Sequence, residues 1–107
     1  MKSFKLELRV YDSNTRRWQV FLERIREDHI VQNWIPPDSG RNYFSKSWSQ
    51  YQISDEALEV YVACTGYGGQ VQCVILINDA KPSKKNSIFS RFDDVKISSK
   101  SFVINSI

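Results

Sequence analysis

The first segment of the chain alternates between apolar and polar residues. Every second position is apolar, and these positions are Phe4, Leu6, Leu8 and Val10. A spacing of two residues is typical of a β-strand that buries one face, because successive side chains of a strand point to opposite sides. The turn-forming residues Asp12, Ser13 and Asn14 follow. The pattern therefore predicts a strand that ends near residue 12.

The next apolar residues fit a second strand. Trp18, Val20 and Leu22 are two positions apart, so they point to one side of an extended chain. A turn at residues 13–15 would fold this strand back onto the first one and place Val10 opposite Trp18. This hairpin uses the turn residues and accounts for Val20.

The same segment also fits a helix. Trp18, Leu22 and Ile25 then lie on one stripe. The helix accounts for Ile25 without the bulge that a strand needs near Arg24. We favour the strand, and an α+β fold with one helix near residues 16–29 is the alternative.

Strand-like segments continue to the end of the chain. Residues 29–35 read as a strand that Pro36 and Pro37 end, and residues 42–53 read as an edge strand or an ordered loop. A C-terminal hairpin is predicted around Ser99-Lys100, and it would place Val95 and Ile97 opposite Ile104 and Phe102. Six to eight such segments at short spacing predict an all-β, antiparallel, sandwich-like fold. No linker divides the 107 residues, so we expect one domain, 1–107.

The stretch CTGYGGQVQC (64–73) predicts a tight hairpin. A two-residue turn favours glycine at both central positions, as at Gly68-Gly69, because both need positive φ. This register sorts apolar residues onto one face, in the pairs Cys64–Cys73, Val62–Ile75 and Val60–Ile77. The two cysteines would form a non-hydrogen-bonded pair with Cα atoms about 4.5 Å apart, which is at the short end of disulfide geometry.

These two cysteines are the only ones in the chain. One interpretation is that both are reduced core residues, which their apolar face favours. The other is a disulfide between Cys64 and Cys73. Two thiols and the single histidine, His29, fall short of the four ligands that zinc usually takes. We therefore expect no metal and no cofactor, and we favour reduced, buried thiols.

Net charge gives little information about binding partners, whereas the hydropathy pattern bears on where the protein is located. The formal net charge of +3 is small for a dedicated nucleic-acid-binding domain. No apolar run approaches the roughly 18 residues of a transmembrane helix. The first ten residues, MKSFKLELRV, alternate in polarity and do not form the apolar core of a signal peptide. If Met1 is the natural start, we expect a soluble cytoplasmic protein.

Catalytic motifs are absent from the sequence. It holds no Gly-x-Ser-x-Gly, phosphate-loop or His-Glu-x-x-His pattern. The carboxylates of Asp55-Glu56 and Asp93-Asp94 are adjacent in sequence, so on strands each pair would point to opposite faces. We expect a protein that is not an enzyme.

Aromatic residues crowd a segment that is otherwise polar and contains few aliphatic residues, between residues 34 and 51. One interpretation is that Trp34, Phe44 and Trp48 fold back over the core. The other is an exposed binding patch made of Trp34, Arg41, Tyr43, Lys46, Trp48 and Tyr51. Trp, Tyr and Arg supply most of the binding energy at protein interfaces.

The patch predicts a non-catalytic binding module for a protein partner, of the inhibitor or immunity type. A carbohydrate-binding β-sandwich is the alternative, because the apolar faces of sugar rings stack on aromatic side chains. Interleaved basic and aromatic residues leave nucleic acid as a third, less favoured ligand. Coplanar exposed rings would favour sugar, whereas a convex patch of aromatic and arginine side chains would favour protein.

Overall fold

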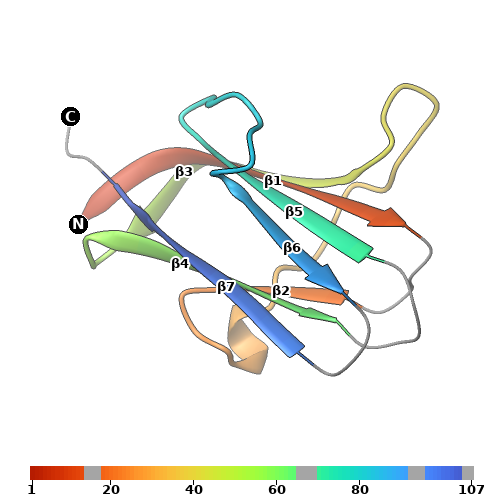
Figure 1. Ribbon diagram of the computed structural model, residues 1–107. Coiled ribbons are helices and arrows are strands. Elements are labelled where there is room, and N and C mark those ends of the chain that lie inside the picture. Colours follow the sequence, from red (N-terminus) through yellow and green to blue (C-terminus); the bar gives the residue numbers. More distant parts are fainter. Residues whose placement is uncertain (14–17, 65–69, 92–95, 105–107) are drawn as a thin grey trace.

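The computed structural model of the chain describes residues 1–13, 18–64, 70–91 and 96–104, and these residues contain no α-helix (Figure 1). They form seven strands: β1 (Lys2–Ser13), β2 (Trp18–Leu22), β3 (Phe44–Ile53), β4 (Ala57–Cys64), β5 (Gln70–Ile77), β6 (Ser87–Arg91) and β7 (Lys96–Val103). A short 3-10 helix, η1 (Glu27–His29), follows β2. The predicted all-β class is confirmed, and the alternative with a helix near residues 16–29 is wrong.

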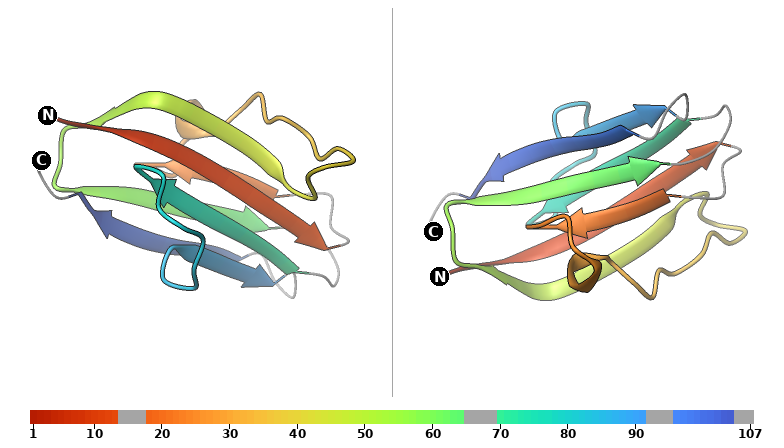
Figure 2. Two further views of the ribbon diagram at one scale, coloured as in Figure 1. Left: turned by 90° about the horizontal axis from the view of Figure 1, so that it is seen from above. Right: turned by 90° about the horizontal axis from the view of Figure 1, so that it is seen from below.

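The strands form two antiparallel sheets that pack face to face. The larger sheet has the order β3-β1-β5-β6 and the smaller one the order β2-β4-β7. Figure 2 shows the larger sheet in front in one view and the smaller sheet in front in the other. The predicted sandwich is therefore confirmed.

Strand β1 is as the alternation predicted. Its apolar residues are almost fully buried, with exposed fractions of 4% for Phe4 and 0% for Leu6, Leu8 and Val10. Strand β1 lies between β3 and β5, however, and β2 pairs with β4 in the other sheet. The predicted hairpin between the first two strands is wrong, because the chain passes from one sheet to the other between Ser13 and Trp18.

The segment after β2 leaves the sheet. Glu23 has a φ of 75°, and its backbone N–H donates to the carbonyl of Glu59 (2.8 Å). Ile25 consequently lies outside the sandwich, 49% exposed. The predicted strand over 29–35 is also wrong. Its only ladder contacts are isolated bridges of Ile30 with Phe21 and of Ile35 with Ser45.

The predicted pairing of Cys64 with Cys73 is wrong. Strand β4 places Cys64 opposite Trp18 and Lys96, whereas β5 places Cys73 opposite Val10 and Ile88 in the other sheet. Five of the six residues sorted onto the apolar face are buried and Ile77 is partly buried, but the two halves of the set face the core from opposite sheets. Gly68 and Gly69 lie outside the described residues.

The C-terminal segment is one strand and not a hairpin. Strand β7 runs through Ser99 and Lys100 and pairs along its length with β4, with Phe102 opposite Leu58. Val95 lies outside the described residues. Residues 42–53 give the expected edge strand, because β3 is at the margin of the larger sheet.

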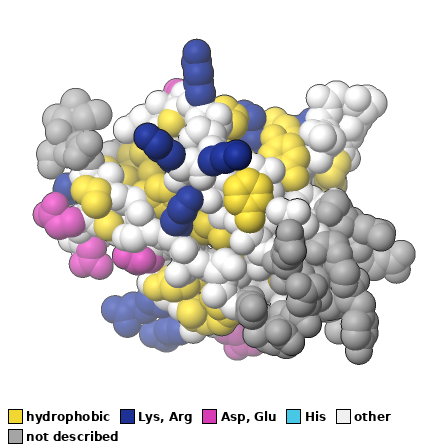
Figure 3. All heavy atoms as spheres, viewed as in Figure 1, with side chains coloured by type: hydrophobic (Ala, Val, Ile, Leu, Met, Phe, Trp, Pro, Cys, Tyr) yellow, Lys and Arg dark blue, Asp and Glu magenta, His cyan; other side chains and the backbone are white. Residues whose placement is uncertain are grey.

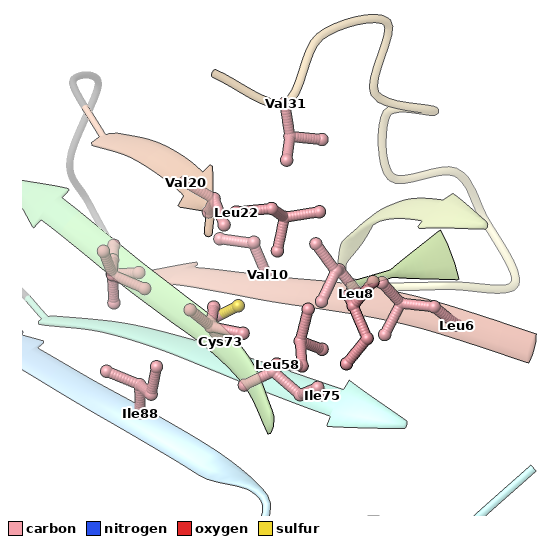
Figure 4. Close-up of a cluster of buried hydrophobic side chains, with 14 of the residues drawn as sticks. Leu6, Leu8, Val10, Val20, Leu22, Val31, Leu58, Cys73, Ile75 and Ile88 are labelled. Carbon is pink, nitrogen blue, oxygen red and sulfur yellow. The ribbon is translucent and has the colours of Figure 1, made fainter. Parts of the chain in front are cut away.

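The core lies between the two sheets. Figure 4 shows aliphatic side chains from both sheets converging there, among them Leu8 and Val10 of β1, Val20 and Leu22 of β2, and Leu58 of β4. Burying one such side chain contributes about 1.5–3 kcal/mol. The alternating apolar positions therefore hold the two sheets together.

A lysine joins the two sheets at the β6–β7 side of the sandwich. The Lys100 ammonium, on β7, donates hydrogen bonds to the backbone carbonyls of Ser87 (2.9 Å), Lys84 (3.2 Å) and Lys85 (3.3 Å). Ser98 also donates to Ser90 across the same side (3.4 Å). Lys100 thus satisfies three carbonyls at the start of β6 with one side chain.

We expect Lys100→Met to lower the free energy of unfolding by about 1–3 kcal/mol, the usual cost of losing hydrogen bonds to a charged donor. Urea denaturation would measure the change. Lys81→Met is the matched control, because Lys81 is exposed in the preceding loop. Equal stability of the two variants would contradict the structural role of Lys100.

Candidate functional site

The side of the sandwich between β2 and β3 is closed by the connection that joins them, residues 23–43 (Figure 2). Val31 anchors this connection: its side chain is 8% exposed, and its N–H donates to the carbonyl of Val20 (2.8 Å). Ile35 and Ser45 exchange two backbone hydrogen bonds of 2.8 and 3.0 Å. The connection therefore packs against both sheets.

Five aromatic side chains fill this side, and we call them the seam cluster: Trp18, Trp34, Phe44, Trp48 and Tyr51. The Trp18 ring meets the Trp34 ring at 5.0 Å and 81°, and it meets Phe44 at 5.3 Å and 68°. Trp48 and Tyr51 meet at 5.4 Å and 68°. Edge-to-face pairs of this kind stabilise a fold beyond their buried area.

Hydrogen bonds fix two of these indole rings. Trp18 Nε1 donates to Asp12 Oδ2, and Trp34 Nε1 donates to the carbonyl of Val31, both at 3.1 Å. Four aromatic residues from 34–51 pack partly buried against the core: Trp34, Phe44, Trp48 and Tyr51. The folding-back interpretation predicted the first three.

A second aromatic group lies on the outer face of the larger sheet. The Tyr11 and Tyr43 rings are 5.2 Å apart, and the guanidinium carbons of Arg9 and Arg41 lie 4.8 and 5.6 Å from the centre of the Tyr43 ring. These are cation–π distances. We call these four residues the outer cluster.

Carboxylates hold both arginines of the outer cluster. Arg9 pairs with Glu7, and this hydrogen bond raises the pKa of Arg9. Arg41 pairs with Asp38 (3.5 Å) and donates to the carbonyl of Pro36 (3.2 Å). The Nε of Arg41 is buried without an acceptor among the described residues. The ion pairs orient the guanidinium groups toward Tyr43.

The outer cluster continues across the sheet. Tyr11 is opposite Gln72, which is opposite Phe89, so these side chains form one row over β1, β5 and β6. Phe89 is 46% exposed. A hollow of about 390 Å³ lies along this row and also includes Asn42 and Gln70. The row presents aromatic and amide side chains at the surface.

The structure divides the predicted patch. Arg41 and Tyr43 belong to the outer cluster. Lys46 and Trp48 are opposite Leu8 and Leu6, so they lie on the inner face of β3. The seam cluster holds the remaining patch residues, Trp34 and Tyr51. The patch is thus not one continuous group of side chains.

Sequence reasoning missed Arg9, Tyr11 and Phe89. Arg9 and Tyr11 occupy the polar face of the first predicted strand, so the alternation placed them at the surface. Nothing local indicated that this strand lies beside the segment of Tyr43, because the β1–β3 pairing joins distant parts of the chain.

Figure 3 shows Lys and Arg side chains gathered over the upper part of the face seen in Figure 1, around the loop between β5 and β6. That loop carries Lys81, Lys84 and Lys85, which are exposed. The seam and outer clusters are built from other segments. None of these three lysines belongs to either aromatic cluster.

Both cysteines are free thiols in the core, 1% exposed for Cys64 and 0% for Cys73. Burial raises the pKa of both thiols, and it raises the pKa of Cys73 to about 12. A thiol is a nucleophile and metal ligand only as the thiolate. The two cysteines are therefore inert structural residues while the protein is folded.

Groups for metal binding are scarce. The described residues hold no group of three or more His, Cys, Asp or Glu side chains placed to bind a metal ion. His29 Nδ1 is 2.8 Å from the carbonyl of Leu22, which fixes the proton on Nδ1. Asp55 and Glu56 are exposed in the β3–β4 turn, and Asp93-Asp94 lie outside the described residues.

No helix in the described part is long and apolar enough to cross a membrane.

Glu23 lies where the connection leaves β2. Burial raises the pKa of its carboxyl group, and Asp55 and Glu59 add to this, whereas a hydrogen bond from the Glu59 backbone and the nearby His29 oppose it. Burial also raises the pKa of the neighbouring Tyr51. The charged form of Glu23 is therefore disfavoured in the folded state.

Comparison of the chain with protein-family models, curated proteins and solved structures found no match. The class of the protein is thus defined by its own fold and surface: an antiparallel β-sandwich with aromatic side chains gathered around one edge strand.

We expect Cys64 and Cys73 to resist iodoacetamide in the folded protein. With a pKa of about 12, only about one Cys73 thiol in ten thousand is ionised at pH 8, and both thiols are shielded by the core. Mass spectrometry should find no adduct without denaturant and two adducts in urea. Rapid labelling of the folded protein would contradict this burial.

We expect Glu23→Gln to stabilise the protein at pH 7. A carboxyl group with a raised pKa binds its proton more tightly in the folded state, so folding is favoured as the pH falls through the folded pKa toward the unfolded value. The glutamine removes both the charge and this rise in stability on acidification. Melting curves of the wild type and the variant between pH 4 and 7, roughly the range where Glu titrates, would measure this change of stability with pH. The exposed Glu27→Gln is the control. A lower melting temperature for Glu23→Gln at pH 7 would contradict the assignment.

Proposed function

We propose that the protein is a non-catalytic binding module and that a partner protein docks on its outer cluster. The observation that carries this proposal is the convergence of Arg9 and Arg41 on the Tyr43 ring, at 4.8 and 5.6 Å. Arginine and tyrosine are enriched among the residues that dominate interface energies. Partly exposed rings lose little conformational entropy on binding.

The ring geometry favours protein over a sugar platform. At the outer cluster, the Tyr11 and Tyr43 rings are tilted by 48° to each other. An open surface platform on which several sugar rings stack side by side needs coplanar aromatic faces. Phe89 and its neighbouring glutamines widen the outer cluster toward the size of a protein interface.

An inhibitor or immunity-type module fits these features. Such a protein needs a rigid surface and no catalytic group, and the outer cluster rests on paired strands of a packed sheet. Reduced, buried thiols are compatible with a cytoplasmic location, since reducing conditions prevail there.

Affinity capture from the native host with the immobilised protein would test the proposal. We expect a captured partner to bind Tyr43→Ala and Arg41→Ala more weakly by about 1–3 kcal/mol each, because both truncations remove interface contacts. Calorimetry with the purified partner would measure the loss, after circular dichroism has shown that each variant is folded.

Tyr61→Ala is the matched control for these variants, because Tyr61 lies on the smaller sheet, opposite Phe21 and Ser99. It should bind the partner like the wild type. A partner that binds Tyr43→Ala and Arg41→Ala with unchanged affinity docks elsewhere and would refute the proposed surface.

A further inference from the structure

A second hollow lies on the seam, away from the outer cluster. It has a volume of about 400 Å³ and is bounded by η1, by the residues that follow it and by the inner face of β3. Small-molecule sites commonly have volumes of about 300–1,000 Å³. The hollow is thus large enough for one small ligand.

Apolar and aromatic residues are among those that line this hollow. Leu22 and Val31 are buried at 4% and 8% exposure and belong to the core, so their positions are fixed. Trp48 and Tyr51 are partly buried and stand at 68° to each other, which makes two walls of a corner. A ligand here needs an apolar face that can lie against an aromatic ring.

The rim of the hollow is polar and carries both signs of charge. Asp28, His29 and Asn33 come from η1 and the chain after it, and Lys46 comes from β3. The Lys46 ammonium lies 5.9 Å from the centre of the Trp48 ring. Carboxylate oxygens accept hydrogen bonds, the ammonium donates them, and the carboxamide does both.

Hydrogen bonds hold the rim in place before any ligand arrives. The bond between His29 Nδ1 and the carbonyl of Leu22 fixes the orientation of the ring, and its Nε2 lies 4.0 Å from Asp28 Oδ2. The indole of Trp34 bonds the carbonyl of Val31 at 3.1 Å. Asn33 has a φ of 60°, a left-handed conformation that asparagine tolerates better than most residues. Such preorganisation lowers the entropic cost of binding.

The geometry points to a neutral carbohydrate as the ligand of this hollow. A pyranose ring has an apolar C–H face for the Trp48 and Tyr51 walls and a ring of hydroxyl groups that both donate and accept. The rim carries two carboxylates, Glu27 and Asp28, against one ammonium, Lys46, so its charges disfavour an anionic ligand. A purely apolar ligand would remove water from the polar rim without replacing its hydrogen bonds. This site goes beyond the protein-binding surface proposed above and does not depend on it.

The three tryptophans give the protein a built-in reporter. In ¹⁵N-labelled protein each indole N–H gives its own signal, and Trp48→Phe identifies the signal of Trp48. We would titrate with glucose, galactose, mannose, N-acetylglucosamine and cellobiose, and with glucuronate as the anionic comparison. We expect at least one neutral sugar to shift the Trp48 signal saturably, with a dissociation constant of about 1 mM or tighter, and to shift the Trp18 and Trp34 signals less.

A pair of glycine substitutions separates binding from folding. Asn33→Gly keeps the left-handed backbone, because glycine adopts it freely, and removes only the carboxamide at the rim. Asn78→Gly is the matched control, since Asn78 has a φ of 53° and lies after β5, outside the lining of the hollow. We expect roughly tenfold weaker sugar binding for Asn33→Gly and unchanged binding for Asn78→Gly.

Three outcomes would overturn the inference. In the first, no neutral sugar gives a saturable shift of the Trp48 signal. In the second, glucuronate binds more tightly than the neutral sugars. In the third, both glycine variants bind a sugar as the wild type does, which would place that sugar outside this rim.

Discussion

Burial of one alternating face of β1 is the interaction on which the rest of the structure depends. Leu6, Leu8 and Val10 are fully buried, and each contributes about 1.5–3 kcal/mol when it leaves water. Because β1 pairs with β3 on one side and β5 on the other, it fixes the register of both neighbours in the larger sheet. The smaller sheet can then bury its own apolar face only by packing against the apolar face of the larger sheet.

A two-layer sandwich leaves two open sides, and the chain closes them by different physical means. At the β6–β7 side, Lys100 and Ser98 bridge the sheets with hydrogen bonds. At the β2–β3 side, the seam cluster and residues 23–43 close the sandwich by packing against the core. The long edge strand β3 also carries an inward-facing lysine, Lys46, and a register irregularity opposite Phe4–Leu6. Inward-facing charges and bulges both oppose pairing of an edge with another chain.

The sequence predicted which face of a strand is buried far better than it predicted which strands pair with each other. The alternation in β1 and β4 identified the buried face correctly, because the same face of a strand is buried whichever strand lies beside it. In β2 and β5 it missed Phe21, Val74 and Leu76, which are buried on the other face. Cys64 and Cys73 show the limit. A tight hairpin and a passage between sheets both bury the same residues, so apolar sorting cannot distinguish them. The prediction of the site had the same limit, because Arg9 and Tyr11 lie beside Tyr43 only through the non-local pairing of β1 with β3.

The position of the two candidate surfaces follows from what the core leaves free. The central strands β1, β4 and β5 are held by neighbours on both sides, so their inner faces are committed to packing. Strand β3 is an edge strand whose outer edge is bridged by Ile35 at Ser45. Its inner face extends past the core to the seam, where Lys46 and Trp48 reach the hollow. The residues just before it carry Arg41 and Tyr43 to the outer face. Because the hollow is lined from the inner face of β3 while the outer cluster comes from β1 and the residues before β3, a ligand in the hollow and a partner on the outer cluster contact different side chains. Each surface can therefore be altered by substitution without removing contacts from the other.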